Sequence, residues 1–254
     1  MTYKTKHQAY LPSATHGLRY FPLIVLGWAI SMCGGCGVAG RGHNMQGVKL
    51  YQQGQHQAAI QKFEQAINRR PEDADGYYNL ASTYYQLGKR NQDTSYLSQA
   101  EIAYNQALQY NHNHEDAYRG LAVLLVETGR PESAFKLLKG WEKRQPKLAD
   151  AKVEVARLYD EFGDKETAVR YLEEALSVDT NSARAWTALA KLREETGDYA
   201  QALANYQRSF ELNSLQPHVG ERVASLQNMI GVTTAPNSTA TTRVASRPWV
   251  PRSY

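Results

Sequence analysis

The chain has 254 residues, of which 42% are hydrophobic and 21% charged, a composition typical of a folded protein with one or two domains. Its formal net charge is +4, but positions 40–231 hold slightly more acidic than basic residues, so this part lacks the clustered Lys and Arg that nucleic-acid binding needs. Both cysteines, Cys33 and Cys36, lie near the N-terminus, which excludes a disulfide, a cysteine nucleophile and a thiolate metal site from the main body.

The first 39 residues have the layout of an export signal. Lys4, Lys6 and Arg19 are the only Lys, Arg, Asp or Glu residues there, an apolar run follows at 21–30, and small residues dominate 31–39. The apolar run is shorter than the roughly 20 residues that cross a bilayer. An export signal at 1–39 is therefore the first interpretation, and an uncleaved membrane anchor is the second.

The segment resembles a bacterial lipoprotein signal, in which a Leu-small-Gly/Ala-Cys box precedes a lipidated cysteine. The stretch Ile30–Cys33 fits this box except at Met32, and Cys33–Cys36 fits except that a cysteine occupies the apolar position. Lipidation at Cys33 or Cys36 is predicted, with non-lipid cleavage after Ala39 as an alternative. A redox Cys-x-x-Cys motif is disfavoured because no strand-helix pattern surrounds it. The resemblance implies export to a bacterial cell envelope, as a membrane-anchored or a periplasmic protein.

A repeated pattern begins after this segment. Glycines recur at intervals of 34, 41, 34 and 34 residues, and a helix with periodic apolar residues is expected on each side of them: Gly54, Gly88, Gly129, Gly163 and Gly197. A fixed period of this length predicts a solenoid of helical hairpins. Each glycine is expected to end a first helix in the left-handed conformation, which residues with a side chain avoid.

Small and large residues recur in register with these glycines. A small residue stands in each first helix, at Gly47, Ala81, Ala122, Ala156 and Ala190. Another enters each second helix, at Ala59, Ala100, Ala134, Ala168 and Ala202, and a large residue follows at Phe63, Tyr104, Leu138, Leu172 and Tyr206. Because helices approach closely only where small side chains meet, this pattern predicts tightly packed hairpins.

The five copies resemble the tetratricopeptide repeat (TPR) family over about residues 40–216. This resemblance implies an all-α fold, a right-handed superhelical solenoid of about five helix-turn-helix repeats, which fall at 40–73, 74–114, 115–148, 149–182 and 183–216. Trp141 departs from the pattern, because the third repeat should have a small residue there. The second repeat has seven extra residues, roughly 91–97, which predict a longer loop between its helices or an extended second helix.

The chain after the last repeat divides into two parts. Residues 217–230 are predicted to form one more helix, because Val219, Val223, Leu226 and Ile230 lie on one stripe. Such a helix would cap the last hydrophobic edge of the solenoid. Residues 231–254 are rich in Thr, Ser, Ala, Pro and Arg and are predicted to be a disordered basic tail.

The sequence contains no recognisable phosphate loop, nucleophile elbow or His-Glu-x-x-His motif. Its densest histidine cluster, Asn111–His114, is interpreted as a polar loop between repeats rather than as a metal site. The protein is therefore predicted not to be an enzyme and to need no cofactor or metal.

The resemblance also implies that the first helices line a concave groove, in which a protein or peptide partner binds. Helical spacing predicts that the following side chains point into this groove: Tyr51, Tyr78, Asn79, Ser82, Tyr85, Arg119, Val123, Arg157 and Lys191. Tyrosines offer contact area at a low entropic cost, and the arginines are suited to carboxylates of a partner.

These features predict a non-catalytic scaffold that is exported and tethered to a membrane through its N-terminal segment. The alternatives are an accessory subunit of an envelope enzyme or secretion complex and a repeat protein that associates with itself. The sequence leaves the oligomeric state and the identity of the partner open.

Overall fold

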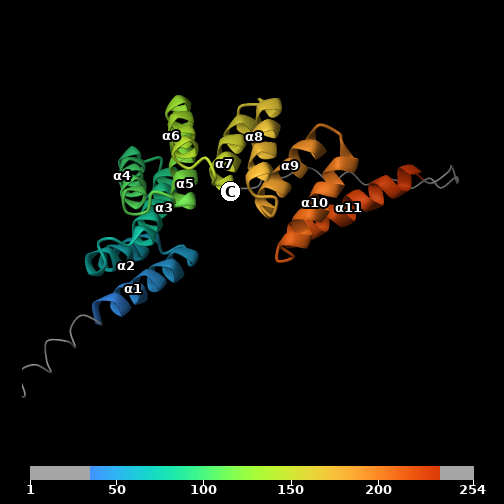
Figure 1. The fold of residues 1–254 in the computed structure, drawn as a ribbon. Helices are drawn as coiled ribbons and strands as arrows, with labels where there is room; N and C mark the ends of the chain where they lie inside the picture. Colours follow the sequence, from blue (N-terminus) through green and yellow to red (C-terminus); the bar gives the residue numbers. More distant parts are fainter. Residues whose placement is uncertain (1–34, 235–254) are drawn as a thin grey trace, which may run out of the picture.

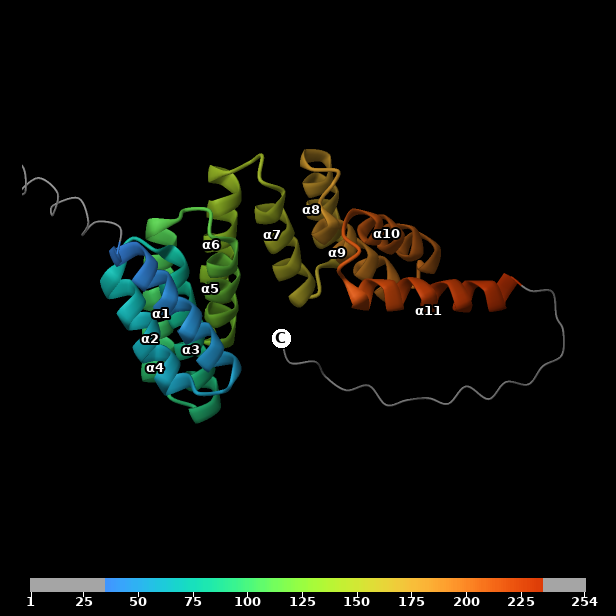
Figure 2. The same cartoon turned by 90° about the horizontal axis from the view of Figure 1, so that it is seen from below.

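The computed structural model describes residues 35–234, and all regular secondary structure in this range is helical. The helices are α1 (Gly35–Gln52), α2 (His56–Arg69), α3 (Ala74–Asn91), α4 (Thr94–Tyr110), α5 (Glu115–Glu127), α6 (Pro131–Arg144), α7 (Ala149–Glu161), α8 (Lys165–Val178), α9 (Ala183–Glu195), α10 (Tyr199–Leu212) and α11 (Pro217–Thr234). They follow one another as helical hairpins along an arc (Figures 1 and 2), which confirms the predicted all-α solenoid.

Contacts between helices define an inner and an outer layer. Each odd-numbered helix from α1 to α9 packs against the even-numbered helix that follows it, and α11 packs on α10. The odd-numbered helices also contact one another in sequence, from α1 through α3, α5 and α7 to α9. The first helices of the five repeats therefore form one continuous inner layer.

The small residues of the repeat lie where the helices are closest. Ala59, Ala100, Ala134, Ala168 and Ala202 are all fully buried. In the first repeat, a Cβ atom added to Gly47 would lie 2.5 Å from Cε1 of the buried Phe63, so a side chain at this position would displace the ring. The predicted alternation of small and large residues thus has a direct steric cause.

Four of the five repeat glycines adopt the left-handed conformation after the first helix. Their φ angles are 74° at Gly54, 75° at Gly129, 81° at Gly163 and 84° at Gly197. The prediction was wrong for Gly88, which lies inside α3. There the left-handed residue is Gln92, with a φ of 54°.

The extra residues of the second repeat explain this difference. They lengthen both of its helices, α3 to 18 residues and α4 to 17, whereas α5 has 13 residues and α6 has 14. Of the two predicted outcomes, the longer loop does not form, whereas the second helix is extended as expected. Gly88 serves instead as a close contact between the two long helices, because a Cβ atom there would lie 2.6 Å from Cδ2 of Leu97.

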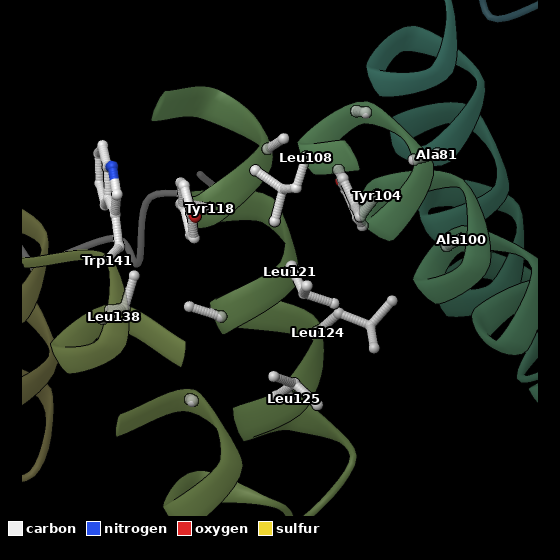
Figure 3. Close-up of a cluster of buried hydrophobic side chains, with 14 of the residues drawn as sticks. Ala81, Ala100, Tyr104, Leu108, Tyr118, Leu121, Leu124, Leu125, Leu138 and Trp141 are labelled. Atoms are coloured by element: carbon white, nitrogen blue, oxygen red, sulfur yellow. The ribbon is translucent and has the colours of Figure 1, made fainter. Parts of the chain in front are cut away.

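Trp141 fits the third repeat by stacking. Its side chain is fully buried, and its ring lies parallel to that of Tyr118, at 4.2 Å between ring centroids (Figure 3). Both residues belong to the large buried cluster that runs from α3 to α7. The flat ring therefore occupies a position where a small side chain was expected.

The two ends of the described part differ from the sequence boundaries. Helix α1 begins at Gly35, inside the segment interpreted as an export signal, and α11 continues to Thr234, past the predicted end at 230. Val219 and Leu226 of α11 are buried with Tyr206 of α10, so this helix covers the last hairpin. Among residues 35–234, no helix combines the length and the apolar character needed to cross a membrane, and the apolar run at 21–30 lies outside this range.

Candidate functional site

A cavity of about 360 Å³ opens on the inner layer at the N-terminal end of the arc. Its lining comes from α1 to α4: Val48, Tyr51, Gln52, Phe63, Tyr78, Asn79, Ser82, Tyr85, Gln86 and Tyr104. None of these ten side chains carries a charge at neutral pH. The five predicted groove residues of the first two repeats, Tyr51, Tyr78, Asn79, Ser82 and Tyr85, thus lie around one cavity, which we call the tyrosine pocket.

Val48 and Gln52 lie on the same face of α1 as Tyr51 by helical spacing. Phe63, Tyr104 and Gln86 were not predicted as groove residues. The first two are the large residues of second helices, and they pass between the first helices to reach the inner layer. Their place in the repeat could have indicated this position, because a large residue that faces a small residue on the neighbouring helix can extend past that helix. Gln86 lies one turn after Ser82 on α3, so helical spacing alone could have identified it.

Hydrogen bonds between helices hold the walls of the tyrosine pocket. Nδ2 of Asn79 donates to Oδ1 of Asn44, at 3.0 Å, which joins α3 to α1. The hydroxyls of Ser82 and Tyr104 are 3.3 Å apart, and the ring of Tyr78 lies 6.2 Å from that of Tyr104. The polar atoms of the pocket are therefore positioned before any ligand binds.

The tyrosines of the pocket are neutral phenols. Burial raises the pKa of Tyr51, Tyr78 and Tyr104 above the ordinary value. Burial also raises the pKa of Tyr85, and Glu127 adds to this effect by accepting a hydrogen bond from its hydroxyl at 2.6 Å. At neutral pH these groups offer hydroxyl donors and ring faces without charge.

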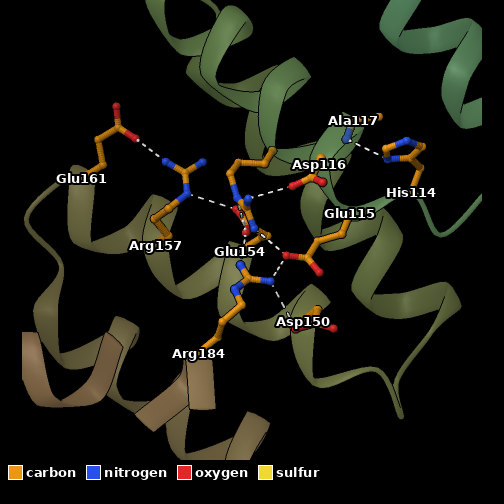
Figure 4. Close-up of polar contacts among 10 residues, drawn as sticks. His114, Glu115, Asp116, Ala117, Asp150, Glu154, Arg157, Glu161 and Arg184 are labelled. Atoms are coloured by element: carbon orange, nitrogen blue, oxygen red, sulfur yellow. Dashed lines mark hydrogen bonds and ion pairs between the residues drawn. The ribbon is translucent and has the colours of Figure 1, made fainter. Parts of the chain in front are cut away.

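The predicted basic residues Arg119 and Arg157 lie further along the same layer and bind a carboxylate of the protein itself. This carboxylate belongs to Glu154 on α7, whose side chain is fully buried. Nε of Arg119 donates to Oε1 of Glu154 at 2.8 Å, and Nε of Arg157 donates to Oε2 at 3.0 Å. Nη2 of Arg184, from α9, donates to Oε1 at 2.5 Å, so one carboxylate links three successive repeats (Figure 4).

More carboxylates surround these arginines. Arg119 also donates to Asp116 and Glu115, Arg157 contacts Glu161, and Arg184 contacts Glu115 and Asp150. Five carboxylates therefore face three guanidinium groups, and we call these eight residues the Glu154 cluster. Burial and the nearby charges of Glu154 and Asp179 raise the pKa of Asp150, as expected where negative charge is in excess.

The remaining predicted residues belong to neither group. Nζ of Lys191 lies 3.5 Å from Asp160 and 3.6 Å from Glu195, in a separate set of ion pairs on α7 and α9. Val123 is partly exposed on α5 and does not line the tyrosine pocket. The nine predicted groove positions thus divide into an uncharged pocket, part of the Glu154 cluster and two outlying residues.

Glu154 and Arg184 were not among the predicted site residues. Their interaction joins residues 30 positions apart, and that of Glu154 with Arg119 joins residues 35 positions apart. The signal was present, since charged residues near the same place in successive repeats come together in a solenoid. What could not be read from the sequence is which charge lies buried at the centre.

The histidine cluster has a structural role. Nδ1 of His114 accepts a hydrogen bond from the backbone N–H of Ala117 and caps α5, while His112 contacts the carbonyl oxygen of Leu108. Among the residues that the structure describes, no group of three or more His, Cys, Asp or Glu side chains could hold a metal ion. Cys33 lies outside this part of the chain, and Cys36 lies in the first turn of α1.

The stacked hairpins define a helical-repeat protein, a class whose solenoids offer extended concave binding surfaces. Sequence models of the TPR repeat match residues 47–88, and models described as tetratricopeptide repeats match 97–149, 149–192 and 183–214. The chain therefore belongs to the TPR family.

Individual relatives are distant. Tetratricopeptide repeat protein 37 of Xenopus laevis is 23% identical over an alignment of 226 residues, and the match covers 75% of this chain but only 14% of that protein. TTC0263, a thermophilic TPR protein of Thermus thermophilus, has a crystal structure that is similar with a TM-score of 0.57 and 25% identity, over 75% of this chain and all of that one. PilF of Pseudomonas aeruginosa is 18% identical with a TM-score of 0.49, over 79% of this chain and 94% of that one.

Proposed function

We propose that this protein is a non-catalytic scaffold that binds an extended segment of a protein partner along its inner layer. The observation that carries the proposal is the tyrosine pocket, an uncharged cavity that five predicted groove residues line together. Tyrosine and amide side chains of this kind provide ring faces for side chains and hydrogen bonds for a peptide backbone. Since hydrogen bonds between α1, α3 and α4 already fix the walls, little entropy is lost on binding.

Site-specific photocross-linking in cells tests this proposal. A photoreactive residue at position 79 or 86, in the tyrosine pocket, should form adducts with a partner protein. The matched control is position 99, where Gln99 is exposed on α4 in the outer layer. Equal adducts from position 99 would contradict binding in the groove. An adduct formed only with a second copy of the chain would favour the alternative of self-association.

A double substitution gives a second test of the same site. Tyr78→Ala together with Tyr85→Ala removes two walls of the tyrosine pocket, so adducts from position 86 should disappear. The helical circular dichroism signal should remain, because both side chains lie only partly in the core. Adducts that survive the substitution would place the partner elsewhere. An enzymatic activity that appears only with the adduct would identify the accessory-subunit alternative.

The proposed scaffold is exported and held at a membrane by its N-terminal segment. Support comes from the sequence alone: basic residues, the apolar run at 21–30, and two cysteines shortly after this run. Because α1 begins at Gly35, a lipid on Cys36 would attach to the first turn of this helix, and a lipid on Cys33 would attach two residues before it. Metabolic labelling with a fatty acid should mark the protein, and labelling that persists after Cys33→Ala and Cys36→Ala together would exclude these sites.

A further inference from the structure

We infer that the groove selects a basic partner: an extended segment that places a neutral aromatic side chain in the tyrosine pocket and a Lys or Arg side chain a few residues away over α5 and α7. This inference rests on the proposed function and specifies the chemistry of its ligand. It also corrects the expectation that Arg119 and Arg157 receive carboxylates of a partner.

The tyrosine pocket determines the first feature of the ligand. With about 360 Å³, it is at the lower end of the range of roughly 300–1,000 Å³ that is common for ligand pockets. Its lining contains four tyrosines and Phe63 but no charged group, so a charged side chain would lose its hydration without gaining a partner. An aromatic side chain instead gains ring contacts, and the Asn79 and Gln86 amides can bond the backbone beside it.

Carboxylates border this pocket on the side of α5 and α7. Glu127 accepts the hydrogen bond from the hydroxyl of Tyr85, and its side chain is 39% exposed. Asp116 is close enough to Tyr78, and Glu161 to Tyr85, for their charges to act on those phenols. The side chains of Asp116 and Glu161 are 53% and 43% exposed, so both remain within reach of a ligand.

The cations of the same surface are already engaged. Nζ of Lys89 lies 2.7 Å from Glu127, and the three arginines of the Glu154 cluster share its buried carboxylate. Glu127 and the cluster together contribute six carboxylates, against Lys89 and three arginines. An acidic segment would therefore meet repulsion here, whereas a basic one would compensate the excess negative charge.

Helix packing sets the spacing between the two features of the ligand. Adjacent packed helices lie about 8–10 Å apart, and an extended chain advances about 3.3 Å per residue. A segment that crosses from α3 to α5 therefore needs about three residues between its aromatic and its basic side chains. A continuation toward α7 would bring a second basic residue to Glu161.

Fluorescence anisotropy with the full chain and labelled synthetic peptides tests the inference. The first peptide consists of Gly and Ser with one Trp and two Arg residues, placed three and six positions after it. The second has Glu in place of both Arg residues, and the third has Ser in place of Trp. We expect the first to bind about tenfold more tightly than either other peptide, and this advantage should shrink as salt rises.

Two variants identify the groups responsible. Asp116→Asn with Glu161→Gln should remove most of the preference for Arg over Glu while leaving the Trp dependence intact. The matched control is Glu132→Gln with Glu166→Gln, which neutralises two exposed carboxylates in the outer layer and should leave the preference unchanged. Circular dichroism verifies that both double variants stay folded.

The outcomes separate this inference from the proposed function. Tighter binding of the Glu peptide, equal binding of both, or no binding of any peptide would overturn the basic specificity. If cross-links from positions 79 and 86 to a partner persist in that case, the scaffold function stands and only its ligand chemistry is wrong. If those cross-links are absent as well, the proposed function of the groove is also wrong.

Discussion

At Gly47 the first hairpin depends on the absence of a side chain. The aromatic ring of Phe63 fills the space that a Cβ atom would need, and the ring is also part of the tyrosine pocket. Gly42 lies in the same helix but has open space where a Cβ atom would be placed. The two glycines therefore share a helix and differ only in their surroundings, which makes them a matched pair.

We predict opposite effects of alanine at these two positions. Gly47→Ala should reduce the free energy of unfolding by about 1–3 kcal/mol, because the added methyl displaces a fully packed ring. Gly42→Ala should raise it by about 0.5–1 kcal/mol, since alanine favours a helix over glycine. Urea denaturation followed by circular dichroism measures both. A stabilising Gly47→Ala would show that Phe63 does not contact α1.

Glu154 holds the most consequential charge of the Glu154 cluster. Its carboxylate is fully buried and accepts hydrogen bonds from arginines of three helices, α5, α7 and α9. Glu154→Gln keeps the shape but removes the charge, which leaves guanidinium groups without their central partner. We expect a loss of about 3–5 kcal/mol in the free energy of unfolding.

The exposed Glu166, on α8 in the outer layer, provides the control for this substitution. Glu166→Gln should change the free energy of unfolding by no more than about 0.5 kcal/mol. Similar urea midpoints for the two variants would mean that the arginines find other partners in solution.

At the scale of single elements, the second repeat shows how a solenoid accommodates an insertion. The extra residues extend α3 and α4 together, and the left-handed turn moves from Gly88 to Gln92. The hairpin stays in register because both helices lengthen on the same side of the stack. Gln92 is the single residue other than glycine with a positive φ between residues 35 and 234, so the turn is formed by a residue type that disfavours it.

We therefore predict that Gln92→Gly stabilises the protein by about 1 kcal/mol, because glycine adopts this conformation without steric cost. Gln99→Gly is the control, since Gln99 is exposed in the interior of α4 and the substitution should cost about 1 kcal/mol there. The midpoint of thermal unfolding should rise for the first variant and fall for the second. A fall for both would indicate that the side chain of Gln92 makes a stabilising contact.

At the scale of the whole molecule, tyrosines donate hydrogen bonds at several places along the arc. Besides the pocket, Tyr84 donates a hydrogen bond to Glu64, and Tyr206 donates one to Glu194. Burial raises the pKa of both phenols to about 12, and for Tyr84 the charge of Glu64 adds to this effect. In the unfolded chain a tyrosine titrates near its ordinary pKa of about 10.

This difference predicts the response to alkaline pH. Since the folded state binds these protons more tightly than the unfolded state, their stabilising effect is complete below about pH 10. It is lost progressively as the pH rises from about 10 to 12. Phenolate absorbance should show buried tyrosines that ionise late, together with a loss of helical circular dichroism. Tyr84→Phe with Tyr206→Phe should reduce the loss of stability in this range. Ionisation of all 17 tyrosines near about pH 10 without unfolding would contradict the prediction.

Local sequence patterns were enough to predict the class of fold, the number and order of the hairpins and most of the residues that line the tyrosine pocket. These features follow from local rules that repeat, namely small residues at helix contacts, glycines at turns and one apolar stripe per helix. Tyr51, Tyr78 and Tyr85 could be assigned to one face because their spacing along each helix sets their direction.

The roles of the charges and of the inserted segment became clear only from the stacking of the repeats in three dimensions. Arg119 looks available in the sequence, but it binds Glu154, which lies 35 positions away from it in the next repeat. Whether a charge faces a partner or a buried carboxylate depends on how successive repeats stack, and no local pattern encodes that distance. In the same way, Gly88 resembles a turn residue in the sequence, and only its contact with Leu97 shows that the helix continues past it.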